Sequence, residues 1–387
     1  MGGDDNPKRK KSKYLSLVLL LIVFVVFALL AALLIFGDFS CSLTFAGCFS
    51  PRLPAVTVNE YTFDVGRDRV FANIEGSVAA VGTLGVQVLD TGGRETLRDS
   101  FRMNRPAVAG SANYGIAFDI GGSAVRVFNA SQVSSSIETD GRIISASINQ
   151  NGWFCIATQE GGGSRGVVTV YNNLGDSVYR VSLGSGYVLS AGLSHDNKSL
   201  AILNLTDGGS RITFYHGIDT YKSEPDHMFD LPGGLIIDFW YKSNGDVVAI
   251  STDSLFIVGS HGNSRSLYEF PENRLGGYTN HNDFIALHLY DYGVGQSGRL
   301  ITLLSDGKML GGKTIDREIV SMSAADKALV LLKSDGLSFY NEYLEEFTLS
   351  ADNLPAAGAN RVLALREDTA LAASDNSAVV IRREEER

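Results

Sequence analysis

The chain has 387 residues and a formal net charge of −10, with 42 glycines but only 8 prolines. This acidic balance argues against nucleic acid as a partner, because the phosphate backbone selects basic surfaces. Abundant glycine suits many tight turns between short strands, and no long amphipathic helix is apparent beyond the N-terminus.

The N-terminal residues predict a membrane anchor. Residues 1–13 form a short tail whose basic side chains are Lys8, Arg9, Lys10, Lys11 and Lys13. Tyr14–Phe36 is uncharged and 23 residues long, and at about 1.5 Å per residue such a helix spans roughly 34 Å, enough to cross a bilayer. A cleaved secretory signal is the alternative, but its apolar core usually has only about 7–15 residues. The positive-inside rule then predicts a single-pass cell-membrane protein with a cytoplasmic N-terminus and an extracytoplasmic remainder.

Residues 37–56 are expected to be a juxtamembrane linker, marked by Pro51 and Pro54. Cys41 and Cys48 lie in this linker, and an oxidising exterior would permit a disulfide across the short loop between them. Two alternatives stay open, namely two free thiols or a lipoprotein cleavage box ending at Cys48. The third cysteine, Cys155, lies in an apolar run and is expected to be an inert core residue.

A paired-strand pattern recurs through residues 57–387. Eight short apolar strands are Val78–Val81, Tyr114–Phe118, Trp153–Ala157, Leu200–Leu203, Val247–Ile250, Phe284–Leu287, Ala328–Leu332 and Ala370–Ala373. Each is followed by a second strand: Val86–Leu89, Val125–Phe128, Val167–Tyr171, Ile212–Tyr215, Leu255–Val258, Leu300–Leu304, Leu337–Tyr340 and Ala378–Ile381. A repeat of roughly 40 residues is typical of propeller blades, so these pairs predict the two middle strands of each four-stranded blade.

The end of the chain bears on the number of blades. After Ile381 only six charged residues remain, so the last blade lacks its outermost strand. We expect the N-terminal segment Tyr61–Val65 to supply that strand, which closes the ring and removes its open edge. The sequence therefore predicts an all-β, eight-bladed β-propeller preceded by one transmembrane helix. Seven blades is the alternative, if the weak inner strand Leu275–Thr279 is misread.

The blade pattern also carries a resemblance. Residues 144–157, Ile-Ser-Ala-Ser-Ile-Asn-Gln-Asn-Gly-Trp-Phe-Cys-Ile-Ala, followed by Val167–Asn172, resemble quinoprotein-type and WD40-type blades. The whole chain resembles a bacterial family of unknown function with a basic tail, one transmembrane helix and an exported propeller. The resemblance implies this architecture and membrane location, but no activity.

Motifs for catalysis or cofactors are not evident in the sequence. The chain shows no nucleophile elbow, phosphate-binding loop, zinc-protease motif or calcium loop. Its 6 histidines are scattered over turns and strands, and its 2 tryptophans are too few for the recurring tryptophan of quinoprotein blades. We therefore expect no cofactor, no metal and no catalytic residue.

Unequal loop lengths suggest where binding takes place. Four connections between the second and third strands are long and rich in glycine, and three of them belong to consecutive blades. Long loops on a rigid scaffold often carry binding residues, although glycine-rich loops also vary in length without consequence. The candidate ligand or partner residues on these loops are Asp119, Gln159, Glu160, Arg165, Asp207, Tyr290, Asp291 and Tyr292.

These features favour a non-enzymatic protein- or ligand-binding or scaffolding module at the cell envelope. The expected partner is an envelope protein, peptide or glycan. The alternative is a propeller hydrolase that acts on envelope glycans or peptides through carboxylates around the channel mouth. That alternative requires at least two carboxylates to converge on one bound ion or sugar.

Overall fold

The computed structural model describes residues 56–159, 165–220, 224–270, 273–291, 298–350, 358–375 and 377–383. The predicted tail, apolar helix and nearly all of the linker lie outside these residues, as do Cys41 and Cys48. Within the described ranges, no helix combines the length and the apolar character that crossing a bilayer requires. Apart from one short 3-10 turn, η2 (Ile218–Thr220), the regular structure described is β-strand.

The strands of the first four blades follow one another along the chain. Blade 1 comprises β2 (Val70–Ile74), β3 (Ser77–Gly82), β4 (Gly85–Leu89) and β5 (Glu95–Ser100). Blade 2 comprises β6 (Pro106–Ser111), β7 (Tyr114–Asp119), β8 (Ala124–Phe128) and β9 (Val133–Glu138). Blade 3 comprises β10 (Arg142–Ile148), β11 (Phe154–Gln159), β12 (Gly166–Tyr171) and β13 (Ser177–Leu183). Blade 4 comprises β14 (Tyr187–Leu193), β15 (Ser199–Thr206), β16 (Gly209–His216) and β17 (His227–Pro232).

The last four blades repeat this order, except that the final one takes its fourth strand from the start of the chain. Blade 5 comprises β18 (Ile236–Tyr241), β19 (Val247–Ser251), β20 (Ser254–Val258) and β21 (Ser264–Glu269). Blade 6 comprises β22 (Asn273–His281), β23 (Phe284–Asp291), β24 (Gly298–Leu304) and β25 (Met309–Ile315). Blade 7 comprises β26 (Ile319–Ala325), β27 (Ala328–Lys333), β28 (Gly336–Tyr340) and β29 (Glu346–Ser350). Blade 8 comprises β30 (Arg361–Arg366), β31 (Thr369–Ala373), β32 (Ala378–Arg383) and β1 (Val56–Tyr61).

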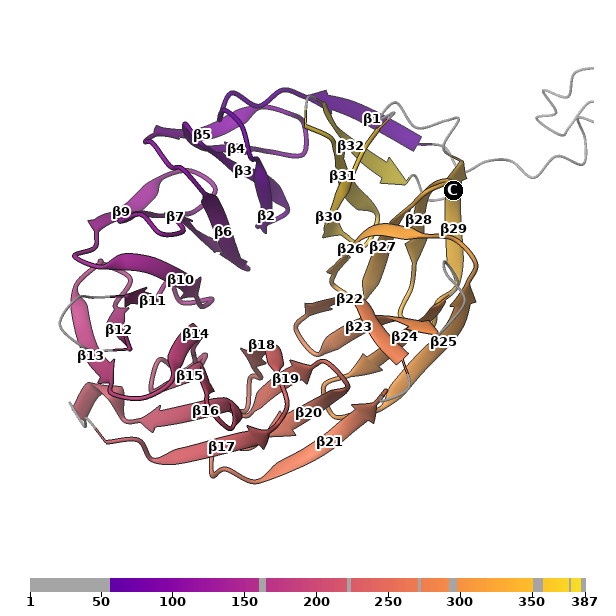
Figure 1. Cartoon of the computed structure of the whole chain (residues 1–387). Helices are drawn as coiled ribbons and strands as arrows, with labels where there is room; N and C mark the ends of the chain where they lie inside the picture. The colour runs from indigo at the N-terminus through magenta and orange to yellow at the C-terminus, as the bar shows by residue number, and fades with distance from the viewer. Residues whose placement is uncertain are drawn as a thin grey trace, which may run out of the picture. The chain divides into compact units, whose positions relative to one another are not determined.

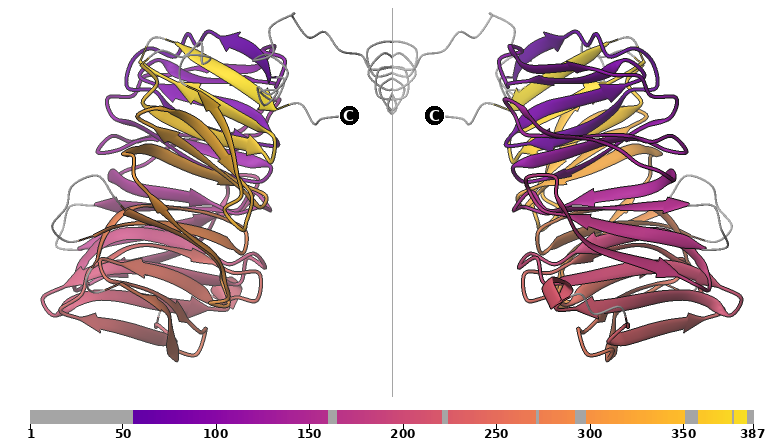
Figure 2. Two further views of the ribbon diagram at one scale, coloured as in Figure 1. Left: turned by 90° about the vertical axis from the view of Figure 1, so that its right-hand side faces the viewer. Right: turned by 90° about the vertical axis from the view of Figure 1, so that its left-hand side faces the viewer.

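The described strands form eight antiparallel four-stranded sheets arranged in a ring (Figure 1). The first strand of each blade lies nearest the axis of the ring and the fourth lies at the rim, while Figure 2 shows the sheets from the side of the ring. The eight-bladed prediction is thus confirmed, and the seven-bladed alternative is wrong. The weak inner strand of blade 6 is β22, where the two glycines after Leu275 break the alternation and the register shifts between Leu275 and Gly277.

Burial explains why the middle strands are so clear in the sequence. Every residue of β4, β19 and β31 is buried, because each blade packs between two neighbours and its middle strands are covered on both faces. The rim strand β13, in contrast, alternates between buried and exposed residues. Cys155 lies in the middle strand β11, where burial raises the pKa of its thiol to about 12, so its predicted core role is confirmed.

Short polar turns join the inner strand of a blade to its second strand. In blade 3 the side chain of Asn149 accepts hydrogen bonds from the backbone N–H groups of Asn151 and Trp153. Gly152 completes this turn at φ +78°, in the left-handed region that glycine adopts without strain. The Asn149 amide also donates to the Ser194 carbonyl at 3.0 Å, so the turn ties blade 3 to blade 4.

The two ends of the described chain close the ring. Strand β1 pairs antiparallel with β32, from Val56 opposite Arg383 to Tyr61 opposite Ala378. The closing strand is therefore N-terminal, as expected, but its predicted position at Tyr61–Val65 is wrong. Phe63 and Val65 follow the strand and pack in the apolar cluster between blades 8 and 1. The alternation of apolar and polar residues at 61–65 therefore reflects this burial rather than hydrogen-bonded pairing in a sheet.

We predict that closure can be weakened at a single buried side chain. Ile381 of β32 is fully buried opposite Val58, so Ile381→Ala is expected to lower the free energy of unfolding by about 2–5 kcal/mol. Glu60 is exposed on the partner strand, and Glu60→Ala should change stability by less than about 0.5 kcal/mol. Chemical denaturation of both variants measures the difference, and equal small effects would contradict a stabilising role for this contact.

Candidate functional site

Near the axis of the ring, inner strands line a cavity of about 620 Å³, and this space is here called the channel cavity. Its walls come from the inner strands of five consecutive blades, β6, β10, β14, β18 and β22, and from the turns that follow them. The lining residues occupy the C-terminal parts of these strands, so the cavity lies toward the face that carries the inner turns, here called the turn face. This volume is within the range of roughly 300–1,000 Å³ that is usual for small-molecule sites.

Hydroxyl and amide side chains make up most of the polar wall. Five serines and four amides line the cavity: Ser111, Ser145, Ser147, Ser190, Ser243, Asn149, Gln150, Asn280 and Asn282. Blade 5 adds three consecutive aromatic residues, Phe239, Trp240 and Tyr241. Hydroxyls and amides both donate and accept hydrogen bonds, so this wall suits a ligand rich in similar groups.

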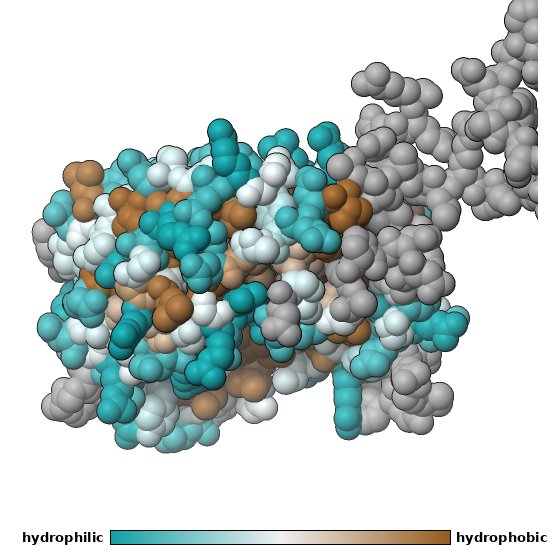
Figure 3. All heavy atoms as spheres, turned by 90° about the horizontal axis from the view of Figure 1, so that it is seen from above, coloured by the Kyte–Doolittle hydropathy of each residue, from teal (hydrophilic) through white to brown (hydrophobic). Residues whose placement is uncertain are grey.

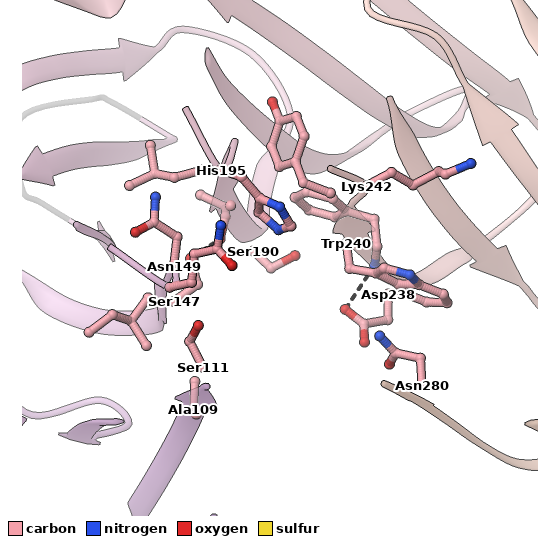
Figure 4. Close-up of a pocket in the computed structure, with 18 of the residues that line it drawn as sticks. Ala109, Ser111, Ser147, Asn149, Ser190, His195, Asp238, Trp240, Lys242 and Asn280 are labelled. Atoms are coloured by element: carbon pink, nitrogen blue, oxygen red, sulfur yellow. Dashed lines mark hydrogen bonds between the residues drawn. The ribbon is translucent and has the colours of Figure 1, made fainter. Parts of the chain in front are cut away.

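Asp238 is the carboxylate set deepest among these groups. It lies on β18 immediately after a register shift between Ile236 and Asp238. Its Oδ1 accepts a hydrogen bond from the Phe239 N–H at 2.8 Å, and its Oδ2 accepts one from the Tyr278 hydroxyl at 3.0 Å. Burial raises the pKa of the Asp238 carboxyl, and the two hydrogen bonds oppose that shift. Figure 4 shows Asp238 between Trp240 and Asn280 on one side of the cavity.

Several buried polar atoms of the cavity wall lack a partner. Among the described residues, six buried side-chain nitrogen or oxygen atoms have no hydrogen bond to another protein group. Three of them belong to residues that line the channel cavity: Ser145 Oγ, Trp240 Nε1 and the Tyr241 hydroxyl. Buried polar groups are normally paired with protein, water or ligand, so these three residues make the cavity the candidate site.

The charged groups at the turn-face end of the cavity are held by blade 6. The Lys242 Nζ donates to the Ser305 carbonyl at 3.3 Å, and the Ser305 hydroxyl donates to the Asp283 carboxylate at 2.5 Å. His195 lies on the other side of the cavity, on the turn of blade 4 (Figure 4). One lysine and two carboxylates therefore face the cavity, without a block of like charge.

The sequence-predicted residues lie on the opposite face of the ring, here called the loop face, where second strands turn into third strands. The register of blade 3 shows this separation, because Gln159 pairs with Arg142 at one end of the sheet. The cavity residues of the same blade pair at the other end, where Ile148 lies opposite Phe154. The loops and the channel cavity are thus two separate regions.

Asp119 has a clear structural role on the loop face. It is only 4% exposed, and its Oδ1 accepts hydrogen bonds from the backbone N–H groups of Asn104 and Arg105 at 2.9 and 2.7 Å. These bonds hold the connection that enters blade 2. The carboxylate therefore stabilises the fold rather than pointing toward solvent.

Three other predicted residues are exposed on neighbouring blades. Gln159 ends β11, and Asp207 lies in the turn between β15 and β16. Arg165 donates to the Tyr187 hydroxyl at 2.5 Å and stacks over the same ring at 4.9 Å, which joins blades 3 and 4. This Arg165–Tyr187 pair links a predicted loop residue of blade 3 to the first strand of blade 4.

The remaining predicted residues belong to blade 6 or lie outside the described part of the chain. Tyr290 is on β23, and its ring packs edge-on against His288 at 4.4 Å between centroids. Asp291 ends β23, while Glu160 and Tyr292 fall outside the described residues together with the Asp291 side chain.

Sequence reasoning missed the residues of the channel cavity. A usable signal was present in Ile236-Ile237-Asp238-Phe239-Trp240, where a carboxylate interrupts an apolar strand. A charged residue in such a run needs either a partner or a ligand, so the position of Asp238 is enough to suggest a candidate binding residue.

Three histidines that are distant in sequence also meet at the rim of blades 4 and 5. The ring of His227 lies 6.0 Å from that of His216 and 5.7 Å from that of His261. Both ring nitrogens of His216 are within hydrogen-bond distance of other groups, at 2.8 Å from the Ser199 hydroxyl and 2.8 Å from the Ser260 carbonyl. These contacts account for His216 as a structural residue between two blades.

The outer surface gives a weaker indication of function than the channel. On the side of the ring seen in Figure 3, hydrophilic and hydrophobic side chains are interspersed. Exposed large apolar residues include Leu174, Tyr187 and Met309, which belong to three different blades. Scattered exposure of this kind is normal for a folded protein.

Comparison with solved structures identifies the fold. Saccharomyces cerevisiae Sqt1 is similar with a TM-score of 0.56 and 10% identity, over 84% of this chain and 98% of that chain. The WD40 domain of SCAP from fission yeast has a TM-score of 0.55 and 12% identity, over 85% and 98% of the two chains. The C-terminal WD40 domain of Sif2 has a TM-score of 0.58 and 14% identity, over 84% and 100%. At these identities the likeness shows a WD40-like propeller and nothing further.

Comparison of sequences gives a family without an activity. No curated protein matches the chain. Residues 55–348 match the model described as "Family of unknown function (DUF5711)". Because this match covers well over half of the chain, the protein belongs to the DUF5711 family of unknown function, with the WD40-like blades that the sequence predicted.

Proposed function

We propose that this protein is a membrane-tethered binding module. Tyr14–Phe36 would hold it in the cell membrane, with residues 1–13 in the cytoplasm and the propeller outside. The propeller would present a binding site to an envelope protein, peptide or glycan. Its role is to hold that partner, and no chemical step is assigned to it.

The observation that carries this proposal is the channel cavity itself. Five consecutive blades contribute polar and apolar groups to one cavity of about 620 Å³. Each wall belongs to a sheet that packs on its neighbours, so the lining groups are pre-positioned rather than carried on free loops. A preformed concave site with a few convergent polar groups is the usual form of a ligand-binding site.

The hydrolase alternative, as predicted from the loop carboxylates, draws no support from those that the structure describes. It requires two carboxylates that converge on one bound ion or sugar. Asp119 is buried and bonded to backbone N–H groups, whereas Asp207 is exposed on another blade. The side chains of Glu160 and Asp291 lie outside the described residues, and we do not propose an activity from them.

Membrane topology can be tested by cysteine labelling. In a chain with Cys41→Ser and Cys48→Ser, Cys155 remains buried, so single new cysteines report their own accessibility. Asp207→Cys on the exposed loop should react with a membrane-impermeant maleimide in intact cells, and Ser12→Cys should react only after permeabilisation. Labelling of Ser12→Cys alone in intact cells would reverse the proposed orientation.

Photo-crosslinking can identify the binding face. A photoreactive residue placed at His195 or Asn282, beside the channel cavity, is expected to form an adduct in cells that carry the full chain. The same residue at the exposed rim position Glu60 is the matched control and should form none. Adducts from Gln159 and Asp207 instead would move the site to the loop face, and equal labelling at every position would contradict a specific binding module.

A binding role for Asp238 predicts a cost in stability. Since burial raises the folded-state pKa of Asp238, its contribution to stability is present below the unfolded pKa of about 3.9 and is lost as the pH rises through the folded value. The amide of Asp238→Asn does not ionise, so stability should no longer be lost as the pH rises. The variant should therefore be more stable than the parent at about pH 7 and similar at about pH 3. Urea denaturation at both pH values measures this, and a less stable variant at neutral pH would show that Asp238 serves the fold.

A further inference from the structure

We propose that the channel cavity binds an uncharged saccharide, with hydroxyl and amide side chains around the sugar and Trp240 against one of its faces. This inference rests on the proposed binding function and adds the chemical class of the ligand. It concerns the turn-face end of the channel rather than the long loops that the sequence singled out.

The first support is the hydrogen-bonding character of the wall. A sugar hydroxyl donates one hydrogen bond and accepts others, and serine and amide side chains have the same double capacity. Nine such residues line the cavity on five different blades. Ser145 Oγ and Trp240 Nε1 add buried polar atoms that have no hydrogen bond to another protein group in the described structure. Hydroxyl groups of a ligand supply the partners that these atoms need.

The second support is the combination of an indole with nearby polar groups. Trp240 is partly buried against the apolar cluster of blades 5 and 6, and it lines the cavity beside Asp238 and Asn280 (Figure 4). Aromatic rings with a polar tip contribute apolar contact area and a directional donor together. A sugar ring has an apolar C–H face and a rim of hydroxyls, so it matches this arrangement.

The balance of charge favours a neutral ligand over an ionic one. Lys242 and Asp283 are both engaged with Ser305, which neutralises much of their effect on the cavity. Burial raises the pKa of Asp238, so the site already disfavours an isolated negative charge. A strongly anionic or cationic ligand would lack a matching cluster of opposite charge.

A peptide is the main competing ligand, and the apolar residues argue against it. Peptide grooves normally provide apolar pockets for anchoring side chains. Phe239 and Tyr241 are each only 8% exposed, because they pack into the core between blades 4 and 5. Ala109, Gly110 and Gly192 also line the cavity, and these small residues add little side-chain volume to its wall. The cavity therefore offers hydrogen bonds rather than anchoring pockets.

Trp240 provides a direct test of saccharide binding. The chain has only 2 tryptophans, so Trp153→Phe leaves Trp240 as the sole indole reporter in the full-length protein. We expect its fluorescence to change saturably when maltotriose, cellotriose or chitotriose is added at up to millimolar concentration. A panel of short neutral peptides is the comparison and should leave the emission unchanged.

Two variants connect this signal to the cavity. Ser145→Ala and Asn280→Ala should each weaken binding of the active saccharide roughly three- to tenfold, as expected for one lost hydrogen bond. Ser182→Ala, exposed on the rim strand of blade 3, should leave the affinity unchanged. Folding is monitored separately, since Ser145→Ala removes an unpartnered hydroxyl and should not lower Tm. Ser147→Ala removes the donor to the Ala191 carbonyl and should lower it.

The outcomes separate this inference from the proposed function. Saturable binding of a saccharide that weakens in Ser145→Ala and Asn280→Ala supports both. Adducts in cells from His195, with no response of Trp240 to any saccharide, would overturn the saccharide proposal and leave the binding module intact. Binding of peptides that is sensitive to the same two variants would likewise overturn it. Saccharide binding that no cavity variant weakens would place the site elsewhere and also overturn it.

Discussion

The pairing of β1 with β32 is the constraint on which the rest of the structure depends. Each blade contacts only its neighbours, so the first and last blades would expose their packing faces unless the ring closed. Hydrogen bonds also join blades 1 and 8, because the Asn73 amide donates to the carbonyls of Ala364 and Leu365 at 3.1 and 2.8 Å. Closure fixes the angle between successive sheets, and that angle in turn determines the width of the channel.

A closed ring allows its inner strands to carry polar residues. The apolar burial that holds the blades together is concentrated in middle strands such as β4, β19 and β31, whose residues are all buried. The inner strands border a channel, so their C-terminal parts tolerate serine, asparagine and even a carboxylate. The apolar middle strands therefore stabilise the ring, while the inner strands supply polar residues to the cavity without any dedicated binding loop.

The sequence was most informative where burial is two-sided. Middle strands appear as continuous apolar runs, and all sixteen were found, although β15, β16 and β23 extend beyond the predicted ends. The alternation of Phe63 and Val65, in contrast, was mistaken for a strand because a core-covering segment has the same period. The channel cavity could not be predicted in this way. Its walls come from five blades, and only the closed ring brings residues as distant as Ser111 and Asn280 to one cavity. Loop length directed attention to the opposite face.

Asp119 and Asp238 show that buried carboxylates can differ in how far the fold compensates their charge. Both interrupt or end an apolar strand, and the sequence alone favoured Asp119. Backbone N–H groups of Asn104 and Arg105 account for Asp119, so its charge is balanced by the fold. The raised pKa of Asp238 indicates that its two hydrogen bonds do not compensate for burial, and unpartnered Trp240 Nε1 lies on the same strand. Such uncompensated groups need an explanation beyond the fold, and the proposed binding role of the channel cavity would supply it.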